Sequence, residues 1–350
     1  MANALFLSPR VVATVASGPL TSPGRVATVG RVRIVREGDV RAVLDMRGCI
    51  DACERAFVAY SSGSAELPAV IHLDVPESKG EIHVKSGHLH GAAFYAVKVA
   101  SGFYGMGPPA IDGLVMVFDA RDGSPAAFLL DGGYLTDLRT GAAGGVAARH
   151  LAPERVERVA VIGTGAQARH QVAALAEVRP GFSEVRVWGR NTDRAVLAVH
   201  DLQAGLDARC SVTSVSSVQE AVDGADVVIT CTAAREALVE AAWLAPGAHV
   251  TAVGSDGPGK QELDPEILRG ADVLVADSIE QCSRLGELQH APEQADRAVE
   301  LGTVCAGEAQ GRTEEEQLTV CDLTGVGVQD VAAANLVMAA MGDRGDTIER

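Results

Sequence analysis

The chain has 350 residues, which is long enough for two domains that each bury a core. Apolar residues make up 47% and charged residues 22%, the balance of an ordinary globular protein. The net charge of -16 argues against nucleic acid or an anionic membrane surface as the main partner. No apolar run approaches the length of a membrane span.

The seven cysteines are scattered and odd in number, and Cys49 and Cys53 have no second pair nearby that would complete a zinc site. Reduced core thiols are the favoured interpretation, and they indicate a reducing compartment, the cytoplasm. The first 36 residues contain no acid but several Arg, Ser, Thr and Pro, a composition weakly similar to a transit peptide. A flexible extension over residues 1–30, or an upstream start codon, is favoured instead.

The first part of the chain predicts a strand, a helix and then more strands. Val32–Val35 is strand-like, and apolar residues recur at helical spacing from Val40 to about Ser61. Four strands are expected between Gly, Pro and Asp breakers, at Ile82–Val84, Tyr95–Val99, Leu114–Phe118 and Ala126–Leu130. The Ala- and Gly-rich segment Thr140–Leu151 suits a helix packed closely against another backbone.

The middle of the chain alternates short apolar runs with helix-like stretches or loops. The runs are Val159–Ile162, Val185–Trp188, Val227–Thr230, Val250–Val253 and Val273–Ala276. Five such runs in series predict an α/β fold with a doubly wound parallel sheet covered on both faces. A last helix, roughly Gln329–Met341, could return to the first domain.

The first of these runs leads into G-x-G-x-x-A, formed by Gly163, Gly165 and Ala168, and then into a helical stretch from Ala166 to about Val178. In such a motif the first glycine makes a tight turn and the second lets the backbone approach a pyrophosphate. The small third residue lets the helix pack on the strand, and the helix N-terminus faces the phosphates. Dinucleotide binding is therefore predicted, against the alternative of a purely structural turn.

The end of the next strand bears on which dinucleotide binds. An NAD-specific site usually places an acid there for the ribose 2′-OH, but here Arg190 follows Gly189 and no acid comes before Asp193. An arginine can pair with a 2′-phosphate, which favours NADP(H) over NAD(H). A surface arginine beside bound NAD is the alternative.

Three segments together resemble the ornithine cyclodeaminase/μ-crystallin family: Leu135–Ala143, Gly163–Ala168 and Ala252–Leu263. The resemblance implies a Rossmann domain over residues 139–324, inserted into an α+β substrate-binding and dimerisation domain of residues 31–138 plus 325–350. It also implies a homodimer that exchanges hydride at the α-carbon of a small amino or imino acid.

The same resemblance places Asp256 as the catalytic acid/base, although an Asp in a Gly-rich loop is also a common turn residue. It implies that Lys98 and Arg139 bind the α-carboxylate of the substrate, and that Lys98 also has a catalytic role. A lysine in that apolar run could alternatively face water at a sheet edge. The cofactor contacts it implies are Arg139, Ala166, Gln167, Thr232, Lys260 and Thr324, beside the two glycines.

One departure from ornithine-type members concerns the substrate. They carry an acid that can hold a distal amine, where this chain has Lys85, which would repel that amine. If Lys85 points into the pocket, it favours a substrate with a second carboxylate, and the pattern is similar to iminosuccinate reductase and to proteins of ectoine utilisation. The alternative is a lysine turned to solvent. The family's substrate arginine has no clear match near Leu67–Leu73, and His72 is the candidate to take its place in substrate binding.

No metal is expected, because His83, His88 and His90 lack the spacing of a helical metal site. The leading hypothesis is an NAD(P)-dependent imine reductase or amino-acid dehydrogenase. A cyclodeaminase that uses NAD catalytically is the runner-up. A non-catalytic NADPH- or ligand-binding protein is the third possibility.

Overall fold

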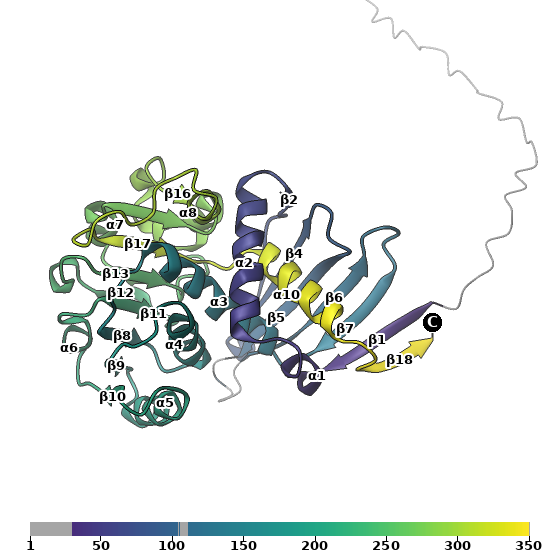
Figure 1. Ribbon diagram of the computed structural model, residues 1–350, viewed down its shortest axis with the longest axis horizontal. Coiled ribbons are helices and arrows are strands. Elements are labelled where there is room, and N and C mark those ends of the chain that lie inside the picture. The colour runs from purple at the N-terminus through teal and green to yellow at the C-terminus, as the bar shows by residue number, and fades with distance from the viewer. Residues whose placement is uncertain (1–29, 104, 106–110, 350) are drawn as a thin grey trace, which may run out of the picture.

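The computed structural model describes residues 30–103, 105 and 111–349, and Figure 1 shows two sheet-centred units joined side by side. The extension expected over residues 1–30 lies outside the described residues except for Gly30. The fold is α/β, as the sequence predicts, with a parallel doubly wound sheet in one unit and a mixed sheet in the other.

The mixed sheet has eight strands among the described residues, in the order β18-β1-β7-β6-β5-β4-β2, with β3 also paired to β4. Only β1 and β7 run parallel to each other. The strands are β1 (Arg31–Arg36), β2 (Ala65–Glu66), β3 (Ile71–Val75), β4 (Gly80–Leu89), β5 (Phe94–Phe103), β6 (Ile111–Asp119), β7 (Pro125–Leu130) and β18 (Asp346–Glu349).

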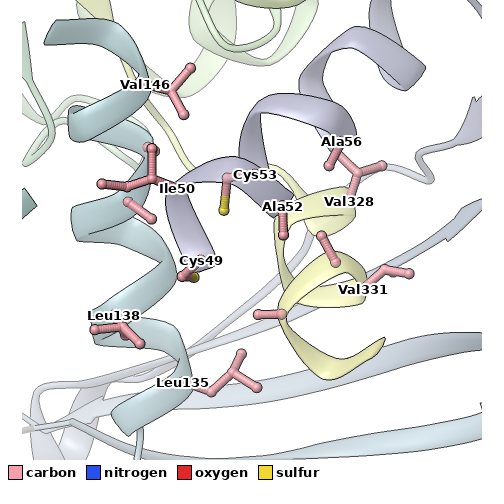
Figure 2. Packing of buried hydrophobic residues seen from close by; sticks show 14 of the residues in the cluster. Cys49, Ile50, Ala52, Cys53, Ala56, Leu135, Leu138, Val146, Val328 and Val331 are labelled. Carbon is pink, nitrogen blue, oxygen red and sulfur yellow. The ribbon is translucent and has the colours of Figure 1, made fainter. Parts of the chain in front are cut away.

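Three helices build the core next to this sheet: α2 (Met46–Ser61), α3 (Tyr134–Leu151) and α10 (Gly327–Ala340). Figure 2 shows α2 between the other two, with Ile50 directed toward α3 and Ala52 toward α10. The prediction of a single helix from Val40 to Ser61 is wrong in one respect. It is broken into α1 (Glu37–Arg41) and α2, because the Asp45 side chain accepts a hydrogen bond from Gly48 N (2.7 Å) and starts a new helix.

The second sheet is parallel throughout, in the order β10-β9-β8-β11-β13-β17-β15-β16 among the described residues. The strands are β8 (Arg158–Ile162), β9 (Glu184–Trp188), β10 (Ser211–Ser214), β11 (Val227–Thr230), β13 (His249–Ala252), β15 (Val273–Ala276), β16 (Val299–Glu300) and β17 (Thr319–Asp322). A small parallel pair, β12 (Arg235–Val239) and β14 (Gln261–Leu263), lies beside it.

Two apolar clusters bury the two faces of this sheet. The helices that contribute are α4 (Ala166–Val178), α5 (Thr192–Gly205), α6 (Val218–Val222), α7 (Pro265–Gly270) and α8 (Ile279–Leu285), and α9 (Leu301–Cys305) packs on α2. The order of strands reverses at β8, whose neighbours β9 and β11 continue in opposite directions. Ligands of open α/β sheets bind at such a switch point, at the carboxyl ends of the strands.

Helix α3 connects the two units, because it packs on α2 and α10 of the first and on α4 of the second. The chain therefore passes from one sheet to the other within a helix that spans residue 139. The last crossing follows β17, where the chain returns through Leu323 and Gly325 to α10, which lies on β4 and β5. These two crossings bring the carboxyl edge of the parallel sheet next to β4 and β5.

The face of the mixed sheet opposite α10 is apolar and only partly buried. Tyr95 and Phe118 stack there with ring centroids 5.0 Å apart. Ile71 and Leu73 are the most open members, 62% and 56% exposed. A continuous apolar face of this kind is typical of a surface that another protein covers.

All seven cysteines are free thiols in the part of the chain that the structure describes. Within those same residues, no helix combines the length and the apolar character that crossing a membrane requires.

Candidate functional site

The glycine turn after β8 has the geometry that a bound pyrophosphate needs. Gly163 adopts a φ of 137°, and a Cβ there would lie 2.7 Å from the carbonyl oxygen of Cys231, so the turn closes only around glycine. Gly165 is the N-cap of α4, and a Cβ on it would meet nothing within 4 Å. The free N–H groups of α4 therefore face open space that phosphate oxygens can fill, while Ala168 is fully buried against the sheet.

A second hollow, of about 630 Å³, lies where β9 and β10 end. It is lined by Trp188, Gly189 and Arg190, by Ser214 at the end of β10, and by Ser216 just after that strand. The Arg190 side chain is exposed and makes no hydrogen bond or ion pair with the described residues. The adenosine half of a dinucleotide fits this place, at the end of the strand next to the glycine turn.

A third hollow, of about 140 Å³, lies between the carboxyl edge of the parallel sheet and the mixed sheet. Six of the thirteen predicted site residues line it: Lys85, Lys98, Arg139, Gln167, Asp256 and Thr324. They come from β4, β5, α3, α4 and the loops after β13 and β17. Residues that are distant in the sequence thus meet at one cavity, where the nicotinamide end of the cofactor and a small substrate would lie together.

A buried ion triad forms one wall of this cavity. Asp330 Oδ1 accepts from Arg139 Nε (2.7 Å) and from Lys98 Nζ (3.0 Å), and the three side chains are only 2–3% exposed. Asp330 Oδ2 is buried without a hydrogen-bond partner in the described residues. Asp330 was not identified from the sequence, although an acid inside the apolar helix that begins near Gln329 is an unusual residue at a core position.

The triad changes how Lys98 titrates. Burial, and then the neighbouring positive charge of Arg139, lower the pKa of Lys98 to about 7, even though Asp330 acts in the opposite direction. Burial tends to raise the pKa of Asp330, but Arg139 and Lys98 reverse this effect and hold it below its usual range. Asp330 is therefore ionised near neutral pH while Lys98 can gain or lose a proton.

Lys85 is buried and turned toward the cavity, not toward solvent. Its Nζ donates to the backbone carbonyls of Thr324 (3.0 Å) and Gly325 (2.7 Å), at the crossing into α10. It has no carboxylate partner among the described side chains, and burial, followed by the charge of Arg139, lowers its pKa. Because an ammonium group has three N–H bonds, one donor remains for a group in the cavity.

Asp256 has 36% of its side chain exposed and is more open than the Glu81, Lys98 and Arg139 side chains at this cavity. It lies 2.8 Å from Lys260 Nζ, which also contacts Glu81 of β4 at 3.1 Å. Burial would raise the pKa of Asp256, but Lys260 and then Lys85 lower it below its usual value. Glu81 was missed from the sequence, although its alternation with His83 and Lys85 along β4 places all three on one face.

The remaining cofactor positions lie at the same edge but make internal contacts. Thr232 N donates to Glu262 (2.5 Å), whose other oxygen accepts from Gly254 N (2.8 Å), so this acid holds two loops together. The Thr324 hydroxyl donates to Asp277 (3.0 Å), away from the cavity. Gln167, near the first turn of α4, donates to Asp137 instead.

The histidines occupy two different places. His72 lies beside a neighbouring hollow that His83 and Asp256 also line. His88 and His90 form no metal cluster in the described residues. Elsewhere in the described residues, Glu54, His150 and Cys305 lie close enough together to hold an ion. This group lies away from the cavity, and the Glu54 carboxylate is already paired with Arg149.

The nucleotide turn and the cation-lined cavity beside it define a class, the NAD(P)-dependent enzymes that act on small acids. Within that class the chain belongs to the ornithine cyclodeaminase/mu-crystallin family, whose model matches residues 32–344. It is an NAD(P)-dependent enzyme of the imine reductase or cyclodeaminase type.

Three similar proteins illustrate the family. An uncharacterised cyclodeaminase of Sinorhizobium fredii is 40% identical over 323 residues, 89% of this chain and 97% of that protein. An archaeal alanine dehydrogenase dimer with bound NAD is 32% identical with a TM-score of 0.82, over 91% of this chain and 99% of that one. The iminosuccinate reductase of Paracoccus denitrificans with NAD+ is 27% identical with a TM-score of 0.80, over 92% and 100%.

Proposed function

We propose that this enzyme uses NAD(P)H to reduce the imine of a small amino acid that carries a second carboxylate. One observation carries the substrate class: Lys85 is a buried cation that faces the cavity without a carboxylate partner among the described residues. A buried charge without a counter-ion is costly, and a carboxylate on the substrate would supply the missing partner.

Different side chains around the cavity bind the two carboxylates of the substrate. Arg139 and Lys98 are held by Asp330, where they can bind the α-carboxylate, and Lys85, which lies directly opposite Lys98 in the β4–β5 register, can bind the second one. The nicotinamide supplies the hydride for the Cα–N bond when it is bound. The triad and Lys85 fix the substrate so that its imine carbon faces that ring.

Asp256 is the group we assign to the proton. It is a partly exposed carboxylate at the cavity, and its low pKa keeps it ionised at rest. In imine reduction it therefore takes up a proton from solvent and then donates it, directly or through a water, to the substrate nitrogen. Lys260 fixes its position through the 2.8 Å contact. We assign to Lys260 this positioning of Asp256, in addition to the cofactor contact that the family resemblance implies.

The cyclodeaminase alternative rests on a different observation. Glu81 is an acid on the cavity wall that could attract a distal ammonium group, and the relative from Sinorhizobium fredii carries the cyclodeaminase name. Glu81 is already paired with Lys260, and Lys85 on the same strand would repel an ammonium ion. The reductase with a dicarboxylic substrate is therefore favoured, and the iminosuccinate reductase, which is named for a dicarboxylic imine, supports it.

The test is to mix the protein with NADH or NADPH and a panel of 2-oxo acids, each with ammonia or methylamine, and to follow absorbance at the nicotinamide band. We expect faster oxidation of NADH or NADPH with oxaloacetate than with pyruvate. The Asp256→Asn variant should lose turnover and still bind cofactor. Release of ammonia from ornithine, with no oxidation of NADH or NADPH in the presence of any 2-oxo acid, would reject the reductase in favour of the cyclodeaminase.

The cofactor preference and the assembly belong to the same proposal. Exposed Arg190 at the adenosine hollow supports NADP(H), although the similar structures hold NAD or NAD+.

The open apolar face with Ile71 and Leu73 supports a homodimer, as does the dimeric alanine dehydrogenase. Sedimentation should give twice the chain mass, and Leu73→Asp should shift it toward the monomer. A monomeric wild type would contradict the dimer. Seven free thiols favour the cytoplasm.

A further inference from the structure

Two histidines on neighbouring strands form a hydrogen-bonded pair that leads away from the catalytic cavity. His72 on β3 and His83 on β4 are directly opposite each other in the strand register, and His72 Nδ1 lies 3.1 Å from His83 Nε2. The other nitrogen of His72 lies 3.1 Å from the carboxylate of Asp74. The three side chains therefore form a continuous chain of hydrogen bonds.

The two ends of this chain lie in different surroundings. Asp74 is at the surface, with 69% of its side chain exposed, whereas His83 is buried. His83 and Asp256 line the same two hollows, the catalytic cavity and the smaller one beside it. Among the described residues His83 Nδ1 has no hydrogen-bond partner. The free nitrogen of His83 is thus available to the hollow that contains Asp256.

Reduction of an imine consumes one proton for each hydride, and Asp256 must regain that proton after every turnover. Its partner Lys260, and then the charge of Lys85, favour the ionised form, so the proton has to come from solvent. We propose that Asp74, His72 and His83 form a proton relay that connects solvent with Asp256. This inference rests on the proposed role of Asp256 and adds three residues that are outside the family motif quoted above.

The transfer balances when each imidazole accepts on one nitrogen and donates from the other. A proton from solvent arrives through Asp74 at His72 Nε2, and the proton on His72 Nδ1 moves to His83 Nε2. The proton on His83 Nδ1 then passes to the Asp256 carboxylate, directly or through one water. No net charge remains on either ring, and the return of both tautomers resets the relay.

The protonation state of His83 suits this role. Burial lowers the pKa of His83 to about 4, with Asp256 and Glu81 acting to raise it and Lys85 and His72 acting to lower it. The other charged groups that line these hollows or contact their acids are Lys98, Asp137, Arg139, Lys260 and Arg284. His83 is therefore neutral at physiological pH, and a neutral imidazole is both a donor and an acceptor.

The activity test uses His72→Gln, which keeps a hydrogen-bonding side chain but cannot carry a proton. We expect kcat to fall by about ten-fold in dilute buffer and to recover when imidazole is added, because a small acid can replace the relay. His90→Gln is the matched control, a half-exposed histidine paired with Glu66. A His72→Gln enzyme with wild-type kcat, or one that imidazole does not rescue, would overturn the relay.

A second readout needs no substrate, so it separates the relay from the proposed reaction. The ring-nitrogen NMR signals of His83, assigned through His83→Gln, should shift at neutral pH when Asp256→Asn is introduced, while those of His90 stay unchanged. Unchanged His83 signals would overturn the relay even in an active reductase. Shifted signals in a protein that oxidises no cofactor would support the relay geometry and reject the reductase.

Discussion

Asp330→Asn is the perturbation that tests the charged wall of the cavity most sharply. The carboxylate binds two buried cations through Oδ1, at 2.7 Å from Arg139 Nε and 3.0 Å from Lys98 Nζ. Removing its charge leaves those cations buried without a counter-ion, and breaking a buried pair in this way costs roughly 3–5 kcal/mol. Because an amide oxygen can keep one of the two hydrogen bonds, we expect about 3 kcal/mol for this variant.

Thermal unfolding followed by circular dichroism or calorimetry measures this loss. A cost of about 3 kcal/mol corresponds to a fall in Tm of roughly 6–12 °C for a domain of this size. Asp346→Asn is the control, since Asp346 pairs with Arg36 at the surface and both side chains are more than 60% exposed. Adding Lys98→Met to Asp330→Asn should recover part of the loss. A fall in Tm no larger than that of the control would refute the reasoning.

Three further predictions concern substrate, cofactor and pH. Lys85→Met should lower kcat/KM for a dicarboxylic imine by about 10- to 100-fold, which corresponds to the loss of a charged hydrogen bond. The kcat/KM for a monocarboxylic imine should change little, and equal losses for both substrates in steady-state kinetics would contradict the prediction. Arg190→Ala should raise KM for NADPH by about ten-fold or more with little effect on NADH, and an unchanged NADPH:NADH ratio would exclude the 2′-phosphate contact. Lys98 is charged below its pKa of about 7 and neutral above it, so KM for the substrate should rise as the pH increases through 7. A KM independent of pH there would show that Lys98 does not bind the carboxylate.

The parallel sheet and the nucleotide turn were predictable because their signals are local. Val159–Ile162 is buried on both faces, and Gly163 has the positive φ that its motif implies. The helix over 166–178 has the bounds that the structure shows. The break before Met46 was missed because a helical apolar pattern continues through it, and only the cap formed by Asp45 marks a new start.

The charge pairs of the cavity could not be derived in the same way, since they join residues far apart in the chain. Asp330 meets Lys98 across 232 positions, and Lys260 meets Glu81 across 179. Such pairs depend on how α10 returns to β4 and β5, which no local pattern specifies. The direction of Lys85 was likewise open in the sequence, because alternation along a strand gives two faces without naming the buried one.

Transfer of deuterium tests the central claim most directly. NAD(P)H carrying deuterium at the transferred position of the nicotinamide ring would be incubated with the enzyme, oxaloacetate and ammonia, and the amino acid formed would be analysed by mass spectrometry. The account predicts one deuterium at the α-carbon for each molecule of cofactor oxidised. An amino-acid product without deuterium at that carbon, or one formed with no net oxidation of cofactor, would contradict it.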